Sequence, residues 1–335
     1  MDAIPTIDIA PFLAGDPDGR RAVAEQVAAA CRETGFLVIA GHGISRETLE
    51  ETFRRAFAFY DLPAAEKARW VPTGPARQRG YHGVATRSLA ATLGQQTPLD
   101  LRESVFLGPV DDHRAHFANL PEAATAYAPN ILPDDPPGTA EAFTGIYREY
   151  ERLSLDLLRI FAVALGLPED HFTALMARHF SILGVHHYPA LDTPPEPGQL
   201  RAGAHTDFGA MTILAMTEGR GGLEARTPDG RWLPVLQAPG ELVVNLGDMM
   251  QRWTNDRWVS TLHRVVVPEL GDSGSRRLSI GYFVHPDFDA AIECLPGPGE
   301  APRHPPITAG AHIAEKIARS HKAPFEAPLA RGTSG

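Results

Sequence analysis

The sequence has little cysteine, no long apolar run and fewer basic than acidic residues. Its two cysteines, Cys31 and Cys294, are too few and too far apart for a CxxC metal or redox motif, and they argue against a disulfide framework. No apolar run approaches the ~18 residues that a membrane span requires. The N-terminal stretch MDAIPTIDIAPFLAG lacks the basic and apolar regions of a signal peptide. These absences predict a cytoplasmic protein without a membrane partner.

The charge balance argues against a nucleic-acid partner. The 335 residues include 31 Lys and Arg against 41 Asp and Glu, which gives a net charge of −10. A nucleic-acid-binding protein needs a basic surface to neutralise phosphates. The 43% of hydrophobic residues is ordinary for a globular protein, and the length allows two domains or one large core with helical additions.

Helical patterns dominate the first 180 residues. Short strands are expected at IPTIDI and GFLVIAGHG. Helices are expected over 19–34, from Ser45 onward, over 139–166 and over 169–179. Beyond residue 180, short strand-like runs recur between turn residues, and Asp229–Gly230 is typical of a hairpin. Many short strands at this spacing favour a jelly roll.

The expected fold class is therefore mixed α/β (α+β). A double-stranded β-helix core of the jelly-roll, cupin-like kind would be flanked by N-terminal and central helices. The pattern divides the chain into an N-terminal region (1–125), a helical segment that packs on the core (126–180), the jelly-roll core (181–290) and a C-terminal extension (291–335). The tail from Pro324 is expected to be disordered.

The stretch GAHTDFG places His205 and Asp207 two residues apart among small neighbours. In an extended chain residues i and i+2 point to the same face, so both side chains could reach one metal ion. On a helix they would diverge by about 200°. We expect the neighbouring glycines to keep one side of the metal open.

His263, in the apolar run STLHRVVVP, is the candidate third ligand. A lone histidine in such a strand is more often hydrogen-bonded to a carbonyl in a core, but the HxD pattern upstream favours a metal site. Two histidines and one carboxylate form the facial triad of non-haem Fe(II) proteins. A jelly-roll protein without catalysis and a zinc hydrolase are alternatives; the absence of an HExxH motif opposes the latter.

The chain resembles the Fe(II)/2-oxoglutarate-dependent dioxygenases of the isopenicillin N synthase-like family, over approximately residues 4 to 290. The matching stretches are IPTIDIAPFLAG, CRETGFLVIAGHGIS, FAFYDLPAAEK, RGYHG, DLRESVFLG, HHYP, AHTDFGAMTIL, VNLGDMMQRWTNDRWVSTLHRV and RRLSIGYF. Singly these motifs are weak, but their order and spacing are specific. The resemblance implies an oxidoreductase that uses Fe(II), 2-oxoglutarate and O2.

Arg277 and Ser279 form a candidate carboxylate site in the stretch RRLS. On a strand the two share a face, and the planar guanidinium of arginine binds carboxylates with two parallel hydrogen bonds. Arg276 points to the opposite face and is expected to form a surface ion pair. The resemblance implies that the carboxylate is the distal one of 2-oxoglutarate, with Tyr188 as a further partner. In some members the same pair binds the substrate's own carboxylate, so a 2-oxoglutarate-independent Fe(II) oxidase is the alternative.

The implied reaction is hydroxylation of a small molecule with release of succinate and CO2, with desaturation or ring closure as alternatives. Amino acids, nucleobases and secondary metabolites are all compatible substrates, and oligomeric state has no signature in the sequence. Asn245 is expected to fix a turn. The candidates for contact with the substrate are Arg79, Tyr81, His82, Arg87, Glu103, Phe106 and Phe283.

Overall fold

The computed structural model describes residues 3–76, 78–95, 97–191, 193–217, 222–267 and 276–321. An eight-stranded and a four-stranded sheet form the centre of the structure. The mixed α/β fold with a double-stranded β-helix core, as predicted, is confirmed. Among the described helices, none is both long and apolar enough to cross a membrane.

The larger sheet draws on both halves of the chain. Its strand order is β1-β2-β10-β7-β12-β5-β4-β3, and all neighbours are antiparallel except β1 and β2. Four of its eight strands thus come from the N-terminal part of the sequence. The strands are β1 (Thr6–Asp8), β2 (Phe36–Ala40), β3 (Gly80–His82), β4 (Glu103–Leu107), β5 (Ile182–Tyr188), β7 (Met211–Met216), β10 (Leu242–Leu246) and β12 (Arg277–Val284).

The smaller sheet has the order β6-β11-β8-β9. Its strands are β6 (Ala202–His205), β8 (Leu223–Arg226), β9 (Trp232–Pro234) and β11 (His263–Val265). The predicted hairpin is confirmed, since the turn between β8 and β9 contains Gly230 with a φ of +88°. A short pair, β13 (Ala291–Ile292) and β14 (Ile307–Thr308), follows near the C-terminus.

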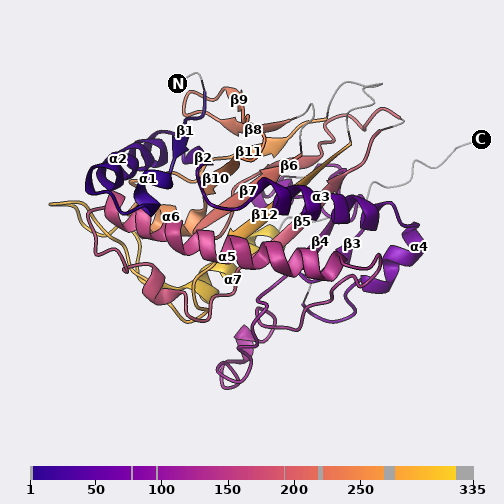
Figure 1. The fold of residues 1–335 in the computed structure, drawn as a ribbon. Coiled ribbons are helices and arrows are strands. Elements are labelled where there is room, and N and C mark those ends of the chain that lie inside the picture. The colour runs from indigo at the N-terminus through magenta and orange to yellow at the C-terminus, as the bar shows by residue number, and fades with distance from the viewer. Residues whose placement is uncertain are drawn as a thin grey trace, which may run out of the picture.

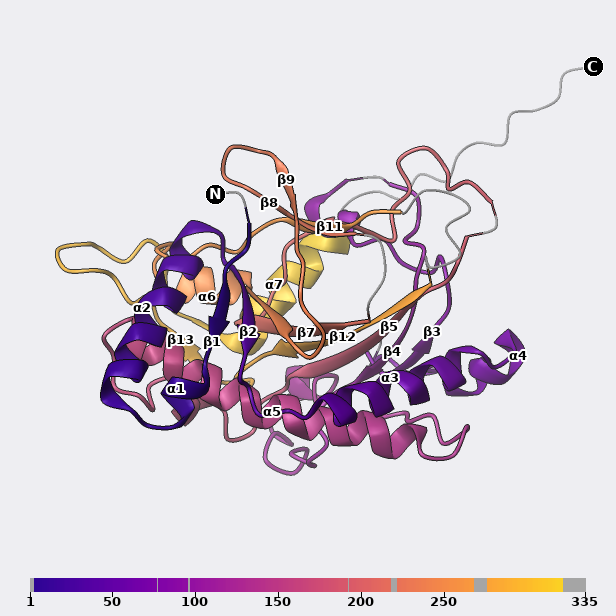
Figure 2. The same cartoon turned by 45° about the horizontal axis from the view of Figure 1, so that its top comes forward.

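Helices α2, α3 and α5 cover the outer face of the larger sheet. Figure 2 shows α3 and α5 along this face, with β8, β9 and β11 on the opposite side of the sheet, and Figure 1 shows α2 beside them. The α-helices are α1 (Ala10–Leu13), α2 (Pro17–Glu33), α3 (Arg46–Tyr60), α4 (Ala64–Lys67), α5 (Thr139–Ala164), α6 (Asp248–Trp253) and α7 (Ala309–His321); 3₁₀ turns occur at η1 (Ala68–Trp70), η2 (Ala90–Leu93), η3 (Pro121–Ala123) and η4 (Thr173–Leu175).

The helix predictions are confirmed except for one segment. Ser45 caps α3 by accepting a hydrogen bond from the Thr48 amide, as its position predicted. The helix expected over 169–179 is wrong: only the 3₁₀ turn η4 forms there, and His179 already bridges to Asp287 at the ends of the paired strands β5 and β12. Helix α7 was not predicted, and the tail from Pro324 lies outside the described residues.

The two faces of the larger sheet differ in character. Residues on the outer face, such as Ile213, Val244 and Ile280, belong to the main apolar core with the helices. The inner face, which the smaller sheet covers, carries a second, smaller apolar cluster that includes Phe36 and Val243, and beside it buried polar side chains such as Thr212 and Asn245. Buried polar groups are costly unless they are hydrogen-bonded or bind a ligand, so the inner face is the place to look for a site.

Candidate active site

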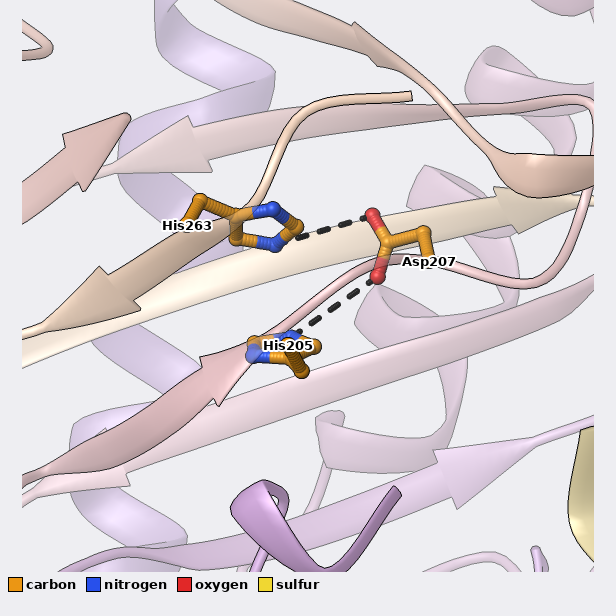
Figure 3. Close-up of side chains that lie close together, drawn as sticks. All are labelled: His205, Asp207 and His263. Carbon is orange, nitrogen blue, oxygen red and sulfur yellow. Dashed lines mark ion pairs between the residues drawn. The ribbon is translucent and has the colours of Figure 1, made fainter. Parts of the chain in front are cut away.

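Two paired strands of the smaller sheet bring the two candidate histidines together. His205 ends β6 and His263 begins β11, and the two are direct partners in the antiparallel register, with ring centres 4.3 Å apart. Asp207 lies two residues beyond His205, on the segment that leads into β7. Figure 3 shows both rings directed at this carboxylate, and the ligand atoms of the three side chains all lie within 4.8 Å of one another.

Backbone carbonyls fix the orientation of both imidazoles. His205 Nδ1 donates to the Gly203 carbonyl at 2.7 Å, and His263 Nδ1 donates to the Thr261 carbonyl at 3.0 Å. Since a carbonyl can only accept, each Nδ1 carries the proton and each Nε2 keeps its lone pair. The Nε2 atoms lie 3.8 and 3.9 Å from the Asp207 carboxylate oxygens, which places three unprotonated donors around one point.

Two polar side chains of the inner face hold the Asp207 carboxylate. Thr212 Oγ1 on β7 and Asn245 Nδ2 on β10 donate to Asp207 Oδ2 at 2.6 and 2.7 Å. Both bonds go to the same oxygen, so Oδ1 is the oxygen that can face a metal. The expectation that Asn245 fixes a turn is wrong: it lies within β10, in register with Thr212. The position of Asn245 in the otherwise apolar strand LVVNL is the feature of the sequence that could have indicated a buried polar role.

The electrostatics of the cluster favour the protonation states that a metal requires. Burial, and then repulsion from His263, lower the pKa of His205 to about 3. Burial raises the pKa of Asp207, but attraction to His263 and His205 and the hydrogen bonds from Thr212 and Asn245 outweigh it, and the pKa lies below its usual value. Near neutral pH His205 is therefore uncharged and Asp207 ionised, as metal ligands must be.

The glycines around the ligands serve close packing. A Cβ on Gly209 would lie 2.6 Å from the Val284 carbonyl oxygen and from the His285 ring, and one on Gly203 would lie 2.9 Å from Ala90. The expectation that these glycines keep one side of the metal open is therefore wrong. Because glycine has no side chain, the segment that carries the ligands can approach β12 and η2 more closely than it could with any other residue at these two positions.

The predicted carboxylate site lies on the same inner face. Arg277 pairs in register with Tyr188, the Tyr188 hydroxyl lies 3.4 Å from Ser279 Oγ, and the Arg277 guanidinium carbon lies 5.7 Å from the Tyr188 ring centre. All three side chains are buried, and burial lowers the pKa of Arg277. Arg276 points to the opposite face, where it forms an ion pair with Asp61 at 2.7 Å, as the alternation predicted.

A second buried arginine lies beside this site and was not predicted. Arg201 precedes β6, is fully buried, and places its guanidinium carbon 5.8 Å from the Tyr188 ring centre. It donates to the Pro189 carbonyl at 3.1 Å. Burial, and then repulsion from Arg277, lower the pKa of Arg201 to about 10. The surrounding sequence, QLRAGAH, gives no periodic pattern that would indicate its burial.

Four of the seven substrate-contact candidates gather around His186 on the inner face. His82 and Phe106 have ring centres 5.6 Å apart, and the Arg87 guanidinium carbon lies 5.5 Å from the Phe106 ring centre. Phe106 and Phe283 lie 5.5 and 6.5 Å from the His186 ring. The pKa of His186 is lowered far below its usual value, first by burial and then by nearby Arg102 and His205. Because His205 is close enough to influence His186, the side chains around His186 lie near this candidate metal ligand.

The other three candidates lie elsewhere. Tyr81 and Glu103 point to the outer face of β3 and β4, opposite His82 and Phe106 in the alternation. Glu103 accepts hydrogen bonds from Tyr81, Lys67 and His187 at 2.5, 2.8 and 2.7 Å, so its carboxylate is occupied. The Arg79 guanidinium donates to the carbonyls of three residues. The expectation that Arg79, Tyr81 and Glu103 face the substrate is not supported; they stabilise the surrounding structure.

This combination defines a class of protein. A jelly roll whose inner wall carries two imidazoles, one carboxylate and an adjoining buried arginine is the architecture of a non-haem Fe(II) enzyme, because this donor set suits Fe(II) and leaves coordination positions open.

Family comparison makes the assignment more specific. Residues 176–286 match the 2OG-Fe(II) oxygenase superfamily, and residues 4–135 match the family described as non-haem dioxygenase in morphine synthesis N-terminal. The chain belongs to the 2-oxoglutarate-Fe(II) oxygenase family.

Relatives and solved structures agree with this assignment. The chain is 32% identical to the 2-oxoglutarate-Fe(II) type oxidoreductase hxnY of Emericella nidulans, over 91% of this chain and 87% of that protein. It is 30% identical to the Validamycin A dioxygenase of Streptomyces hygroscopicus subsp. limoneus, over 94% and 86%. The crystal structure of a full-length Neurospora crassa protein in complex with alpha-KG superposes with a TM-score of 0.81 at 29% identity, covering 94% of this chain and 96% of that one. The protein is thus an oxidoreductase that uses Fe(II) and 2-oxoglutarate.

Proposed function

We propose that this protein hydroxylates a small molecule, with Fe(II) held by His205, Asp207 and His263 and with the distal carboxylate of 2-oxoglutarate held by Arg277, Ser279 and Tyr188. The observation that carries the proposal is that both sets of residues line the inner face between the two sheets. Thr212 and Asn245, which hold Asp207, are on the same face of the larger sheet as Ser279 and Arg277.

The side chains present fit these ligands. When bound, Fe(II) and 2-oxoglutarate supply the oxidation of a C–H bond by O2 with release of succinate and CO2. The chain's own part is to orient them: the Gly203 and Thr261 carbonyls hold the imidazoles, and Thr212 and Asn245 hold the carboxylate. Such outer hydrogen bonds fix ligand geometry and raise ligand basicity. Arg277 would neutralise the distal carboxylate in a buried position, where a charged hydrogen bond is strong.

Two alternatives for the reaction rest on the same residues. Desaturation or ring closure would need the same iron and co-substrate and would differ in how the substrate is positioned. In an Fe(II) oxidase that does not use 2-oxoglutarate, Arg277 and Ser279 would hold a carboxylate of the substrate. The family assignment favours 2-oxoglutarate. A cytoplasmic location and the lack of nucleic-acid or membrane partners stay predictions from the sequence.

The pair Arg277→Gln and Arg276→Gln tests the proposed co-substrate site. The two arginines are adjacent, but only Arg277 faces inward; Arg276 pairs with Asp61 on the helical side. Losing a charge-assisted pair of hydrogen bonds costs about 1.5–3 kcal/mol, or roughly 10- to 100-fold in affinity for 2-oxoglutarate. We expect Arg277→Gln to lose that affinity, measured by succinate release at varied 2-oxoglutarate, and Arg276→Gln to keep it. Equal behaviour of the two variants would contradict the proposal.

A further inference from the structure

A cleft on the inner face is lined by three of the substrate-contact candidates, His82, Arg87 and Phe106, and the kind of group that it binds has not been assigned. It lies between the loop before η2 and the inner faces of β3 and β4, next to His186. Ser104, which lines it, lies 2.7 Å from His186 Nδ1 through its Oγ. The lining residues are His82, Gly83, Thr86, Arg87, Asp100, Arg102, Ser104 and Phe106.

Arg102 is the unusual member of this lining. It directly precedes β4, where Glu103 points outward and Ser104 inward, so the alternation directs Arg102 to the inner side with Ser104. Its side chain is half-buried. Within the part of the chain that the structure describes, its guanidinium has no ion pair and no side-chain hydrogen bond. Its guanidinium nitrogens are absent from the buried polar atoms without a hydrogen-bond partner, so they stay accessible and can meet a ligand that enters the cleft.

The acidic residue of the cleft is already engaged. Asp100 Oδ1 accepts a hydrogen bond from the Gly203 amide at 2.9 Å, and Oδ2 accepts one from the Leu89 amide at 3.0 Å. These bonds tie the cleft to β6, the strand that ends in His205. Asp100 therefore holds the backbone, and although Arg102 attracts its carboxylate, the two form no direct ion pair.

A second arginine adds positive charge to the cleft. Arg87 Nη2 lies 3.3 Å from His82 Nδ1, and its guanidinium carbon lies over the Phe106 ring. Asp100 of the same cleft is hydrogen-bonded to the Gly203 amide, two residues before His205, so the positive charge of the cleft lies near the strand that carries a candidate metal ligand.

Resting on the proposed oxygenase function, we propose that this cleft binds a carboxylate of the substrate through Arg102, with Arg87 beside it, so that the enzyme selects organic acids over neutral or cationic molecules. A guanidinium matches a carboxylate with two parallel hydrogen bonds. The Phe106 ring provides an apolar surface for the carbon skeleton next to that group. Asp100 of the cleft is bound to Gly203 on the strand that ends in His205, so the skeleton would extend from Arg102 along β6 toward the metal.

Matched pairs of acids and amides test the proposal. The probes are aliphatic and aromatic monocarboxylic acids, each compared with its own primary amide, titrated calorimetrically into the Fe(II)- and 2-oxoglutarate-loaded protein without O2. We expect at least one acid to bind tenfold or more tightly than its amide. Arg102→Gln should remove that difference and Arg102→Lys should restore part of it. Arg114→Gln, which removes an exposed arginine paired with Asp112, should leave it unchanged.

The slow conversion of 2-oxoglutarate to succinate without substrate separates the two claims. If the native protein shows no conversion with any probe or without one, the proposed function fails and this inference fails with it. If Arg102→Gln still binds Fe(II) and 2-oxoglutarate in the calorimeter but loses the preference for acids, while Arg114→Gln keeps both the native conversion rate and the preference, the inference is supported. It is overturned if no acid binds more tightly than its amide to a native protein that converts 2-oxoglutarate, or if Arg102→Gln keeps the preference.

Discussion

The hydroxyl of Thr212 offers a sharp test of how the chain prepares its metal site. Thr212→Val replaces the hydroxyl by a methyl group of similar volume and removes one of the two hydrogen bonds to Asp207 Oδ2. Asn245 keeps the other bond, so the carboxylate stays held from one side only. We expect the metal to bind more weakly while the fold is retained.

The size of the effect follows from the geometry. The bond is 2.6 Å long, both groups are buried, and the acceptor is an ionised carboxylate. A hydrogen bond to a charged group contributes about 1.5–3 kcal/mol. Loss of a partner that orients a metal ligand typically weakens metal binding by about 10- to 100-fold. We therefore expect the dissociation constant for Fe(II) to rise by that factor.

The assay is a calorimetric titration of the metal-free protein with Fe(II) in the absence of O2, which gives the dissociation constant for Fe(II). Thr52→Val is the matched control, because Thr52 is also buried but donates its hydroxyl to the Thr48 carbonyl within α3. It should leave the metal affinity within about twofold. If Thr212→Val binds Fe(II) as tightly as the native protein, or if Thr52→Val loses affinity equally, the reasoning about Asp207 is refuted.

Three further predictions concern packing, pH and metal. Gly209→Ala should lower the free energy of unfolding by about 1–3 kcal/mol, because the new Cβ overpacks against Val284. Gly145→Ala should raise it by about 0.5–1 kcal/mol, because its Cβ meets nothing within 4 Å and alanine is favoured over glycine within a helix such as α5. Urea unfolding measures both changes. Burial lowers the pKa of His285 to about 4, so the unfolded chain takes up a proton near pH 6.5 that the folded chain takes up only near 4. Stability should therefore fall as the pH falls from 6.5 to 4, by up to roughly 3 kcal/mol from this group, and His285→Asn should flatten that slope. Adding Mn(II) at 100 times its dissociation constant should stabilise the native protein by about 2.7 kcal/mol, with a corresponding rise in Tm, and chelation should reverse it; a similar rise in His263→Ala would argue against the assigned ligands.

The parts of the fold and site that depend on local pattern could be predicted. The recurrence of short strand-like runs between turn residues after residue 180 predicted the jelly roll, and the spacing of His205 and Asp207 predicted that both point the same way. Arg276 and Arg277 were assigned to opposite faces for the same reason, and the structure agrees.

The parts that depend on register between distant strands could not. Whether Tyr81 and Glu103 face the site is set by how β3 and β4 pair with β5, and no local pattern fixes that pairing. The contact of Asn245 with Asp207 likewise requires β10 to lie beside β7 in one register. Arg102 was missed because only the folded chain shows that its guanidinium has no ion pair among the described residues.

The central claim is that one inner wall holds both the metal and 2-oxoglutarate, and one spectroscopic measurement tests it most directly. Fe(II) is added to the protein without O2, 2-oxoglutarate follows, and the visible charge-transfer band of the chelate is recorded for the native protein, His263→Ala and Arg276→Gln. We predict the band in the native protein and in Arg276→Gln and its loss in His263→Ala. Tight Fe(II) binding without any band, together with O2 consumption that yields no succinate, would contradict the account.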